Sequence, residues 1–312
     1  MKAVFLEPKS SFRNDLRSDT MWGLIISSLS LLHDESYIDK IIEQYLNYQL
    51  PFKISSCFPY RLNNGKRLIY LPKPILPGGM NSDADSDNQK RFKRIKYIEL
   101  EYFNRIISGA ELENFRFDDK DKYLENSFST ELFVKIQLNR LSMTTQNKEG
   151  EGQIFNTPEN FISNGGLYFL IDGDVGIIEP ALRLMSHIGF GGYTSKGKGN
   201  FQYFIDDIDI IIPDNPNAKL NLSLYHPLRE ELHSFIKNDN FFYEILTRKG
   251  KVANQHRTDK VIEKLPVNYF AEGSVFPDLN KPNYGTLINS FKNDSKKVFN
   301  YGFSFNIPIN VV

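Results

Sequence analysis

The sequence predicts an α+β protein with antiparallel sheets, divided into two domains. Strand-like and helix-like segments are interleaved in both halves of the chain, which favours this class over an all-α fold or a barrel. The length of 312 residues suggests two domains. A turn-rich segment at 213–217 reads as a linker. We therefore predict an N-terminal domain over 1–212 and a C-terminal domain over 213–312.

The first domain opens with a strand over 1–6. The hydroxyl and carboxylate oxygens of residues 18–20 are suited to cap a helix that runs to about residue 32. We predict a short helix over 180–188, because Pro180 suits the first helical position and Gly189 suits the C-terminal cap. Apolar periodicity and proline boundaries predict the remaining elements: helices over 37–48 and 92–107, and strands over 52–58, 67–71, 129–138, 166–171 and 201–205.

The second domain shows the same mixture of elements. We predict strands near 220–224, 241–246, 266–270 and 301–307, and a helix over 227–237. Two polar segments of the first domain, 78–90 and 142–152, are predicted to be loops or excursions.

A glycine-rich segment over 189–201 is the most informative stretch of the chain. It contains five glycines and two lysines, and none of its residues is acidic. Glycine permits positive φ and close backbone approach, so such a turn can present bare N–H groups to an anion. We interpret the segment as a contact for the phosphate backbone of a nucleic acid. The alternative is a flexible loop between a helix and a strand.

Nucleotide-binding motifs do not account for this segment. Gly199 stands where a P-loop needs a Ser or Thr to hold magnesium, and the predicted order of helix, loop and strand is the reverse of a P-loop. Thr194 stands where the dinucleotide fingerprint needs its third glycine. The sequence thus argues against an ATPase or a dehydrogenase.

Composition limits the class of function further. The formal net charge is zero, which weighs against a free-standing, nonspecific nucleic-acid binder. Basic residues nevertheless gather near the glycine-rich segment, whereas Asp206, Asp207 and Asp209 follow it. The single Cys57 excludes an intrachain disulfide, and no apolar signal segment opens the chain. We expect a cytoplasmic protein that meets RNA on one side and proteins on another.

Several segments together resemble one family. The glycine-rich segment resembles the glycine-rich loop of the RAMP superfamily of CRISPR systems. Other segments resemble one branch of it, the handle-capping subunit of type III-A (Csm) effector complexes. The similarity covers most of the chain in the same order, with motifs at 18–23, 54–59, 71–74, 140, 248–251, 272–276 and 301–308.

The resemblance implies two ferredoxin-like, RRM-related units. It also implies a non-catalytic role in antiviral defence, without cofactor or metal. In this role the protein binds the 5′ handle of the guide RNA and meets the target RNA only indirectly. The implied partners are the large polymerase/nuclease-like subunit and the first backbone RAMP subunit. Asn139 stands where the family often has Asp, and Arg140 is retained. The segment 142–152, with Met143, is expected either to project as a thumb hairpin or to form an unstructured loop.

The candidate RNA contacts come from the glycine-rich segment and from basic or polar residues in the other motifs. Tyr193 is expected to stack on a base or to fold back onto the sheet. The basic residues Arg248 and Lys249 are expected to make a second contact with RNA or with another subunit, or to lie in a solvated loop. The candidates are Ser18, Arg140, Arg183, Gly189, Gly191, Gly192, Tyr193, Ser195, Lys196, Gly197, Lys198, Gly199, Arg248 and Lys249.

Two other classes of function stay open at the level of sequence. His33 suits the general base of a guide-RNA-processing endonuclease of the same fold, although a histidine at a helix end is also favoured by the helix dipole. Alternatively, the glycine-rich segment packs on a neighbouring protein. Metal binding is not expected, because His226 and His233 lack partnering cysteines.

Overall fold

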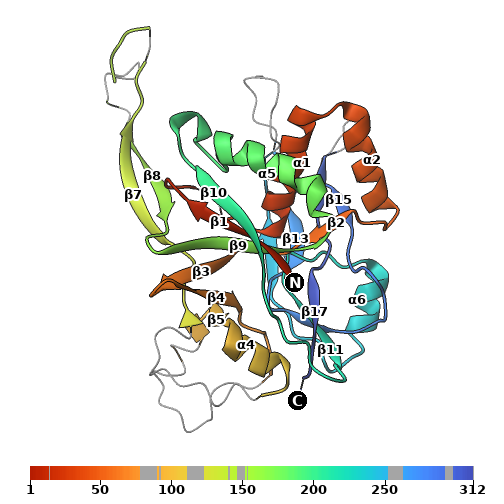
Figure 1. The fold of residues 1–312 in the computed structure, drawn as a ribbon. Coiled ribbons are helices and arrows are strands. Elements are labelled where there is room, and N and C mark those ends of the chain that lie inside the picture. The colour runs from red at the N-terminus through yellow and green to blue at the C-terminus, as the bar shows by residue number, and fades with distance from the viewer. Residues whose placement is uncertain are drawn as a thin grey trace.

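The structure is a computed structural model that describes residues 1–13, 15–77, 90, 93–110, 123–139, 141–145, 152, 154–251, 263–291 and 298–311. Its largest element is an antiparallel sheet in the N-terminal part of the chain (Figure 1). The strand order is β10 (Phe201–Asp207), β1 (Lys2–Pro8), β9 (Gly165–Gly173), β3 (Phe58–Asn63), β4 (Lys66–Pro72), β5 (Tyr97–Glu99) and β6 (Tyr123–Leu124), with β2 (Phe52–Ile54) also paired to β9.

Two helices, α1 (Ser18–Leu32) and α5 (Val175–Ile188), cover one face of this sheet side by side, and α2 (Glu35–Leu46) packs beside α1 (Figure 1). Successive side chains of a strand point to opposite faces. Val4 and Phe169 accordingly face these helices, whereas Phe5 and Tyr168 lie in a second core with α4 (Leu100–Ile107). The sheet therefore separates two hydrophobic cores, and burial of apolar side chains on both faces holds the helices to it.

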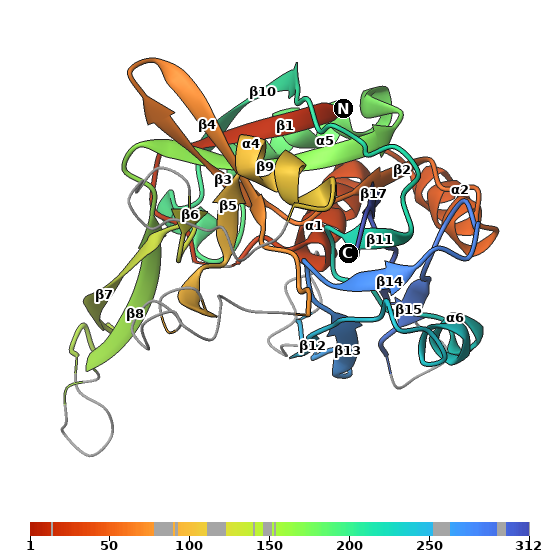
Figure 2. The same ribbon diagram turned by 90° about the horizontal axis from the view of Figure 1, so that it is seen from below.

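The C-terminal part is built from smaller antiparallel sheets. One has the order β14 (Val275–Pro277), β11 (Ala218–Asn221), β17 (Asn306–Ile309), and two further pairs are β12 (Ile245–Arg248) with β13 (Val267–Phe270) and β15 (Leu287–Asn289) with β16 (Phe299–Tyr301). The helix α6 (Arg229–Phe235) lies at its outer side (Figure 2). Leu220 and Ile307 enter the core that contains Phe5, so the two parts share apolar contacts.

A two-stranded hairpin projects from the body of the molecule (Figures 1 and 2). It consists of β7 (Ser129–Ile136) and β8 (Ile154–Phe161), which pair along their full length. Leu132, Val134 and Ile136 alternate along β7, and all three are exposed. The segment 142–152, for which a thumb or a loop was expected, lies beyond these strands and mostly outside the described residues.

The predicted class, α+β with antiparallel sheets, is confirmed, and several element boundaries are corrected. The helix expected from Pro180 begins at Val175 and contains Pro180 internally, because the Asp174 side chain accepts the Gly176 N–H and caps an earlier start. The helix expected over 92–107 is α4, which begins only at Leu100; residues 97–99 instead pair with β4, so tertiary pairing overrides local propensity. Among the described helices, none is long and apolar enough to cross a membrane.

Candidate nucleic-acid interface

The glycine-rich loop joins α5 to β10, as the sequence predicts. Gly189, Gly191, Gly197 and Gly199 have φ between +74° and +81°. This region of φ is costly for residues with a Cβ atom, which explains the glycines. Tyr193 is also left-handed, at φ 68°, and precedes a short 3-10 turn, η3 (Thr194–Lys196).

The base of the loop is held by backbone hydrogen bonds. The Phe190 N–H donates to the Gly199 carbonyl at 3.0 Å, and the Gly199 N–H donates to the Ser11 carbonyl at 2.8 Å. A Cβ atom on Gly199 would lie 2.0 Å from the Phe190 carbonyl oxygen. At the tip, the N–H groups of residues 191–193 have no acceptor among the described residues. The loop is therefore fixed at its base, and its tip leaves donors that can bind an anion.

Three cations surround the ring of Tyr193. The Lys135 and Lys196 ammonium nitrogens lie 4.6 and 4.7 Å from the ring centroid, and the Arg13 guanidinium carbon lies 4.7 Å from it. The Arg13 side chain also lies against Gly192. These four residues, here called the Tyr193 cluster, come from the N-terminal segment, the hairpin and the loop. The ring thus lies among cations, which concentrates positive charge beside the free N–H groups.

Glu159, on β8, connects the N-terminal segment, the hairpin and the glycine-rich loop through its carboxylate. Its carboxylate accepts hydrogen bonds from Lys135 at 2.6 Å and Ser11 at 2.6 Å, and pairs with Lys198 at 2.9 Å. Only 1% of Glu159 is exposed, because these side chains lie over it. Desolvation opposes its ionisation, but the hydrogen bonds from Lys135, Ser11 and Lys198 outweigh it and lower its pKa to about 2. Glu159 is therefore an anion that fixes the position of the lysines.

The two lysines of the loop, Lys196 and Lys198, therefore have different surroundings. Lys198 is half-buried and pairs with Glu159, so its ammonium attaches the loop to β8. Lys196 is exposed and makes no ion pair among the described residues. Of the loop residues expected to bind RNA, those from Gly191 to Gly197 form the outer part of the loop, whereas Gly189, Lys198 and Gly199 form its base.

Sequence reasoning missed three residues of this site: Arg13, Lys135 and Glu159. Arg13 lies in a segment without a predicted element. The alternation over 129–138 places Phe133 and Lys135 on one face of a strand, but no local pattern shows what that face meets. The contacts connect positions far apart in the sequence, which is why periodicity does not reveal them.

The other candidate residues do not join this cluster. Arg183 is on α5, where its side chain is 71% exposed and lies 3.7 Å from Glu179. Lys249 forms an exposed ion pair with Glu263. Arg140 lies outside the described residues.

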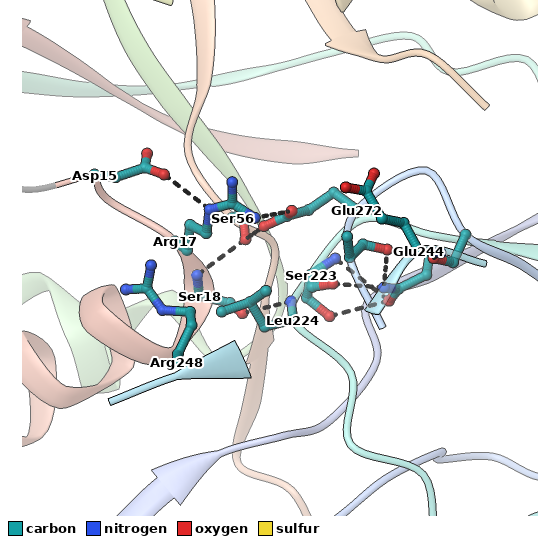
Figure 3. A network of polar contacts seen from close by, with 12 residues as sticks. Asp15, Arg17, Ser18, Ser56, Ser223, Leu224, Glu244, Arg248 and Glu272 are labelled. Carbon is teal, nitrogen blue, oxygen red and sulfur yellow. Dashed lines mark hydrogen bonds and ion pairs between the residues drawn. The ribbon is translucent and has the colours of Figure 1, made fainter. Parts of the chain in front are cut away.

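Ser18 and Arg248 instead connect the N-terminal and C-terminal parts (Figure 3). Ser18 is fully buried: its N–H donates to the Ser56 hydroxyl at 3.0 Å, and its own hydroxyl accepts the Leu224 N–H at 2.9 Å. Arg248 donates to Asp19 at 2.8 Å and to Thr20 at 2.9 Å. A direct contact of Ser18 with RNA is not supported by this position, because none of its surface is accessible.

A second chain of polar contacts runs beside this connection. Arg17 donates to Asp15 and to Glu272, both at 2.8 Å, and Glu272 also accepts from the Ser56 hydroxyl (Figure 3). Desolvation opposes the charge on Arg17, but Glu272 and Asp15 outweigh it and raise its pKa above the ordinary value. The motifs at 18–23, 54–59 and 272–276 thus meet at the junction of the two parts.

Comparisons with known proteins show which proteins this chain resembles. The RAMP superfamily model matches residues 8–202, and the CRISPR Csm4 C-terminal domain model matches residues 214–309. A CRISPR system Cms protein Csm4 from Thermococcus onnurineus (strain NA1) is 26% identical over 320 residues, covering 98% of this chain and 96% of the relative. A protein of the same name from Streptococcus thermophilus is 21% identical over 231 residues, covering 72% and 70%.

Solved structures share the fold. A chain in a crystal structure of a Csm1-Csm4 cassette in complex with pppApA matches with a TM-score of 0.64 and 22% identity, covering 100% of this chain and 98% of that one. A chain in a crystal structure of a Csm3-Csm4 subcomplex in the type III-A CRISPR-Cas interference complex matches with a TM-score of 0.64 and 19% identity, covering 99% and 100%.

Replacing Glu159 by Gln is expected to lower the free energy of unfolding by about 2 kcal/mol at pH 7, because Lys135 and Lys198 lose their shared anion. A depressed pKa stabilises the folded state above the ordinary value of 4.5, and this contribution is lost as the pH falls from 4.5 towards 2. The difference between wild type and variant should therefore shrink across that window. Denaturant unfolding at pH 7 and pH 3.5 measures it.

The matched control for this experiment is Glu131→Gln, which removes the exposed carboxylate directly opposite Glu159 in the hairpin. It should change stability by less than about 0.5 kcal/mol. Equal effects of the two substitutions, or a Glu159→Gln effect that does not depend on pH, would contradict the assigned role of Glu159.

Ser18→Ala is expected to destabilise the protein by about 1–3 kcal/mol, because the buried Leu224 N–H loses its acceptor. Retention of RNA by the assembled complex should stay within twofold of wild type. Thermal unfolding and RNA retention are measured together, with Ser27→Ala on the same helix as control, since the Ser27 hydroxyl has no hydrogen-bond partner among the described residues. Loss of RNA without loss of stability would restore Ser18 as a direct contact.

Proposed function

This chain belongs to the RAMP superfamily, and we propose that it is the Csm4-type subunit of a type III-A CRISPR effector complex, where it binds the 5′ handle of the guide RNA without cleaving it. The two family models confirm the resemblance first seen in the sequence motifs. The observation that carries the RNA-binding role is the Tyr193 cluster beside the free N–H groups of the glycine-rich loop.

The chemistry of the cluster fits a phosphodiester. Arg13 has a planar guanidinium that can donate two parallel hydrogen bonds to one phosphate, and Lys196 adds an exposed point charge. The N–H groups of residues 191–193 supply short-range donors that need no side-chain ordering. Lys135 and Lys198, held by Glu159, keep the cluster in place before RNA arrives.

Two ferredoxin-like units with a boundary near residue 212 are part of this proposal. The order β10-β1-β9-β3, with every neighbour antiparallel and with α1 and α5 on one face, supports such a unit in the N-terminal part. The ranges matched by the two family models, 8–202 and 214–309, support the boundary. Ser18 and Arg248 would then fix the two units to each other.

The proposed partners are the large polymerase/nuclease-like subunit and a backbone RAMP subunit. Chains of the same fold occur in solved assemblies named for Csm1 with Csm4 and Csm3 with Csm4, which supports this assignment. A net charge of zero suits a subunit with a fixed place in an assembly. Arg67 pairs with Asp206, and the N-terminal amine lies 3.7 Å from Asp207, which reduces the negative charge that these two residues offer to a protein partner.

No described contact favours the endonuclease alternative. His33 follows α1 and stacks on Tyr37 at 4.1 Å between ring centroids. Among the described residues, none forms a hydrogen bond with its imidazole. A general base is usually oriented by such a partner, so no observation on the described residues argues for His33 in that role.

The double variant Arg13→Ala with Lys196→Ala is expected to weaken guide-RNA binding by the assembled complex about 10- to 100-fold at 0.15 M salt, since two phosphate contacts are lost. The slope of log affinity against log salt should fall by about 2. The measurement is equilibrium RNA binding at four salt concentrations. Lys40→Ala with Lys237→Ala, which removes two exposed lysines elsewhere, should change neither quantity.

An unchanged affinity and an unchanged salt slope for the Arg13 and Lys196 double variant would overturn the phosphate-binding role of the glycine-rich loop.

A further inference from the structure

The strand β10 forms one margin of the large sheet (Figure 2), and its outer edge has no partner strand among the described residues. It pairs with β1 alone, in an unbroken register over its seven residues. The backbone groups of an antiparallel strand point alternately to its two sides. The outer side of β10 therefore carries a row of backbone N–H and C=O groups that another strand can use.

Hydrogen bonds at both ends of β10 define which of its backbone groups face outward. The Lys9 N–H donates to the Asn200 carbonyl at 2.7 Å, and the Ile208 N–H donates to the Met1 carbonyl at 2.8 Å. Given the register between these two bonds, the even-numbered residues of β10 exchange hydrogen bonds with β1. The outward groups therefore belong to the odd-numbered residues, which are Phe201, Tyr203, Ile205 and Asp207.

Three of these four outward N–H groups are available to a partner. The Asp207 N–H donates to the Asp206 carboxylate at 2.9 Å, which closes that end of the edge. The N–H groups of Phe201, Tyr203 and Ile205 have no acceptor among the described residues. Residues 201–205 include no proline and no charged side chain, and their register with β1 contains no bulge. The edge thus lacks the features that usually keep another strand away.

The side chains beside this edge are apolar on the face of the sheet that carries the helices. Phe201 and Tyr203 belong to the core that α1 and α5 cover, and Ile205 lies on the same face because side chains alternate along a strand. The exposed fraction of Ile205 is 36%, and Tyr203 is half-buried. A strand laid against β10 would cover both side chains and remove apolar surface from water.

The chemistry of the edge favours a protein segment over RNA. Donors and acceptors alternate along it, and an extended polypeptide offers the matching pattern, whereas phosphodiester oxygens only accept. The segment 206–209 adds three carboxylates and no basic residue. Arg67 and the N-terminal amine offset part of this charge, but Asp209 is exposed and makes no ion pair among the described residues. A matching segment therefore carries a basic residue near Asp209.

We propose that the outer edge of β10 is the docking site for an extended segment of a partner subunit. This segment adds a strand to the large sheet through the backbone of Tyr203 and Ile205, and it places a basic side chain near Asp209. The inference rests on the proposed place of the chain in an effector complex and assigns a surface to one of its protein contacts. The basic glycine-rich loop precedes β10 and the acidic residues follow it, so RNA and protein contacts lie at opposite ends of the strand.

The first test is amide hydrogen exchange at single-residue resolution, on the full chain alone and in the assembled complex. In the chain alone, the N–H groups of Tyr203 and Ile205 should exchange at least tenfold faster than those of Gln202 and Phe204, which donate to β1. In the complex, exchange at Tyr203 and Ile205 should slow at least tenfold. Exchange at these two residues that is as fast in the complex as in the chain alone would overturn the inference.

Two further samples identify the occupant of the edge. One contains the chain with guide RNA and no other subunit, and the other contains the chain alone at high concentration. Neither should slow exchange at Tyr203 or Ile205 by more than twofold. Protection by guide RNA alone would assign the edge to RNA, and protection that grows with concentration would assign it to a second copy of the chain. Either result would overturn docking of a partner subunit.

Tyr203→Pro tests the backbone contact itself. The substitution removes one outward N–H and leaves the hydrogen bonds to β1 in place, because proline is tolerated where an edge strand points its N–H to solvent. Binding of this variant to a complex reconstituted from the other subunits and guide RNA should weaken about tenfold or more. The matched control, Tyr203→Ala, loses the ring but keeps the N–H and should weaken binding less than threefold. Wild-type binding by a folded Tyr203→Pro variant would contradict the proposal; if that variant does not fold, the exchange measurement on wild type decides.

Asp209→Asn tests the charge that selects the docking segment. It should weaken the same binding by about threefold at about 0.05 M salt and by less at about 0.5 M, because salt screens exposed charges. Asp239→Asn, which removes an exposed carboxylate from the C-terminal part, should change binding at neither salt concentration. Equal effects of the two substitutions would show that no basic residue faces Asp209 and would overturn that part of the inference.

The outcomes keep this inference separate from the proposed function. A wild-type chain that joins the complex and binds RNA while the outward N–H groups of β10 stay unprotected overturns the docking inference alone. An Arg13 and Lys196 double variant that binds RNA normally, with these N–H groups protected, overturns the phosphate-binding role alone. A chain that joins no complex overturns the proposed function and the docking inference with it.

Discussion

The candidate RNA site depends on one ionised carboxylate, that of Glu159. It joins the hairpin to the N-terminal segment through Ser11 and to the glycine-rich loop through Lys198. These segments are not neighbours in sequence, and the loop reaches the core only at its base, where Phe190 packs on Phe12 and Phe201. A surface ion pair usually contributes less than about 1 kcal/mol, but a carboxylate covered by three donors contributes more. Glu159 thereby attaches the glycine-rich loop to the hairpin and to the N-terminal segment.

The glycines and Glu159 have complementary tasks. Positive φ at four glycines turns the chain so that N–H groups face outward, and the close approach of Gly199 to Phe190 closes the base of the loop. Glu159 then pairs with Lys198 at the base of the loop and holds Lys135 beside Tyr193. The surface that results is positive around Tyr193, although the whole chain is neutral. Such preorganisation reduces the entropy lost when RNA binds.

Sequence reasoning predicted the elements that depend on local signals. The α+β class, the apolar helix α1 and the helix–glycine loop–strand unit follow from periodicity and from Gly189 at the C-terminal cap of α5. The N-terminal cap expected at residues 18–20 is wrong, because the N-cap of α1 is Arg17 and its side chain makes no capping hydrogen bond. It did not predict that residues 97–99 join the sheet, because their pairing with β4 is a long-range contact. Arg13, Lys135 and Glu159 were missed for the same reason. Ser18 was assigned to RNA although it is buried, since a sequence does not show which hydroxyl accepts a distant N–H.

The difference between Lys196 and Lys198 offers the most direct test of this account. Each is replaced singly by Met, and both the melting temperature of the protein and the salt dependence of guide-RNA binding are measured. Lys196→Met should lower the log–log salt slope by about 1 and leave the melting temperature unchanged. Lys198→Met should lower the melting temperature by several degrees, because Glu159 loses a partner. If the two variants are indistinguishable in both measurements, Glu159 does not organise the site and the account is contradicted.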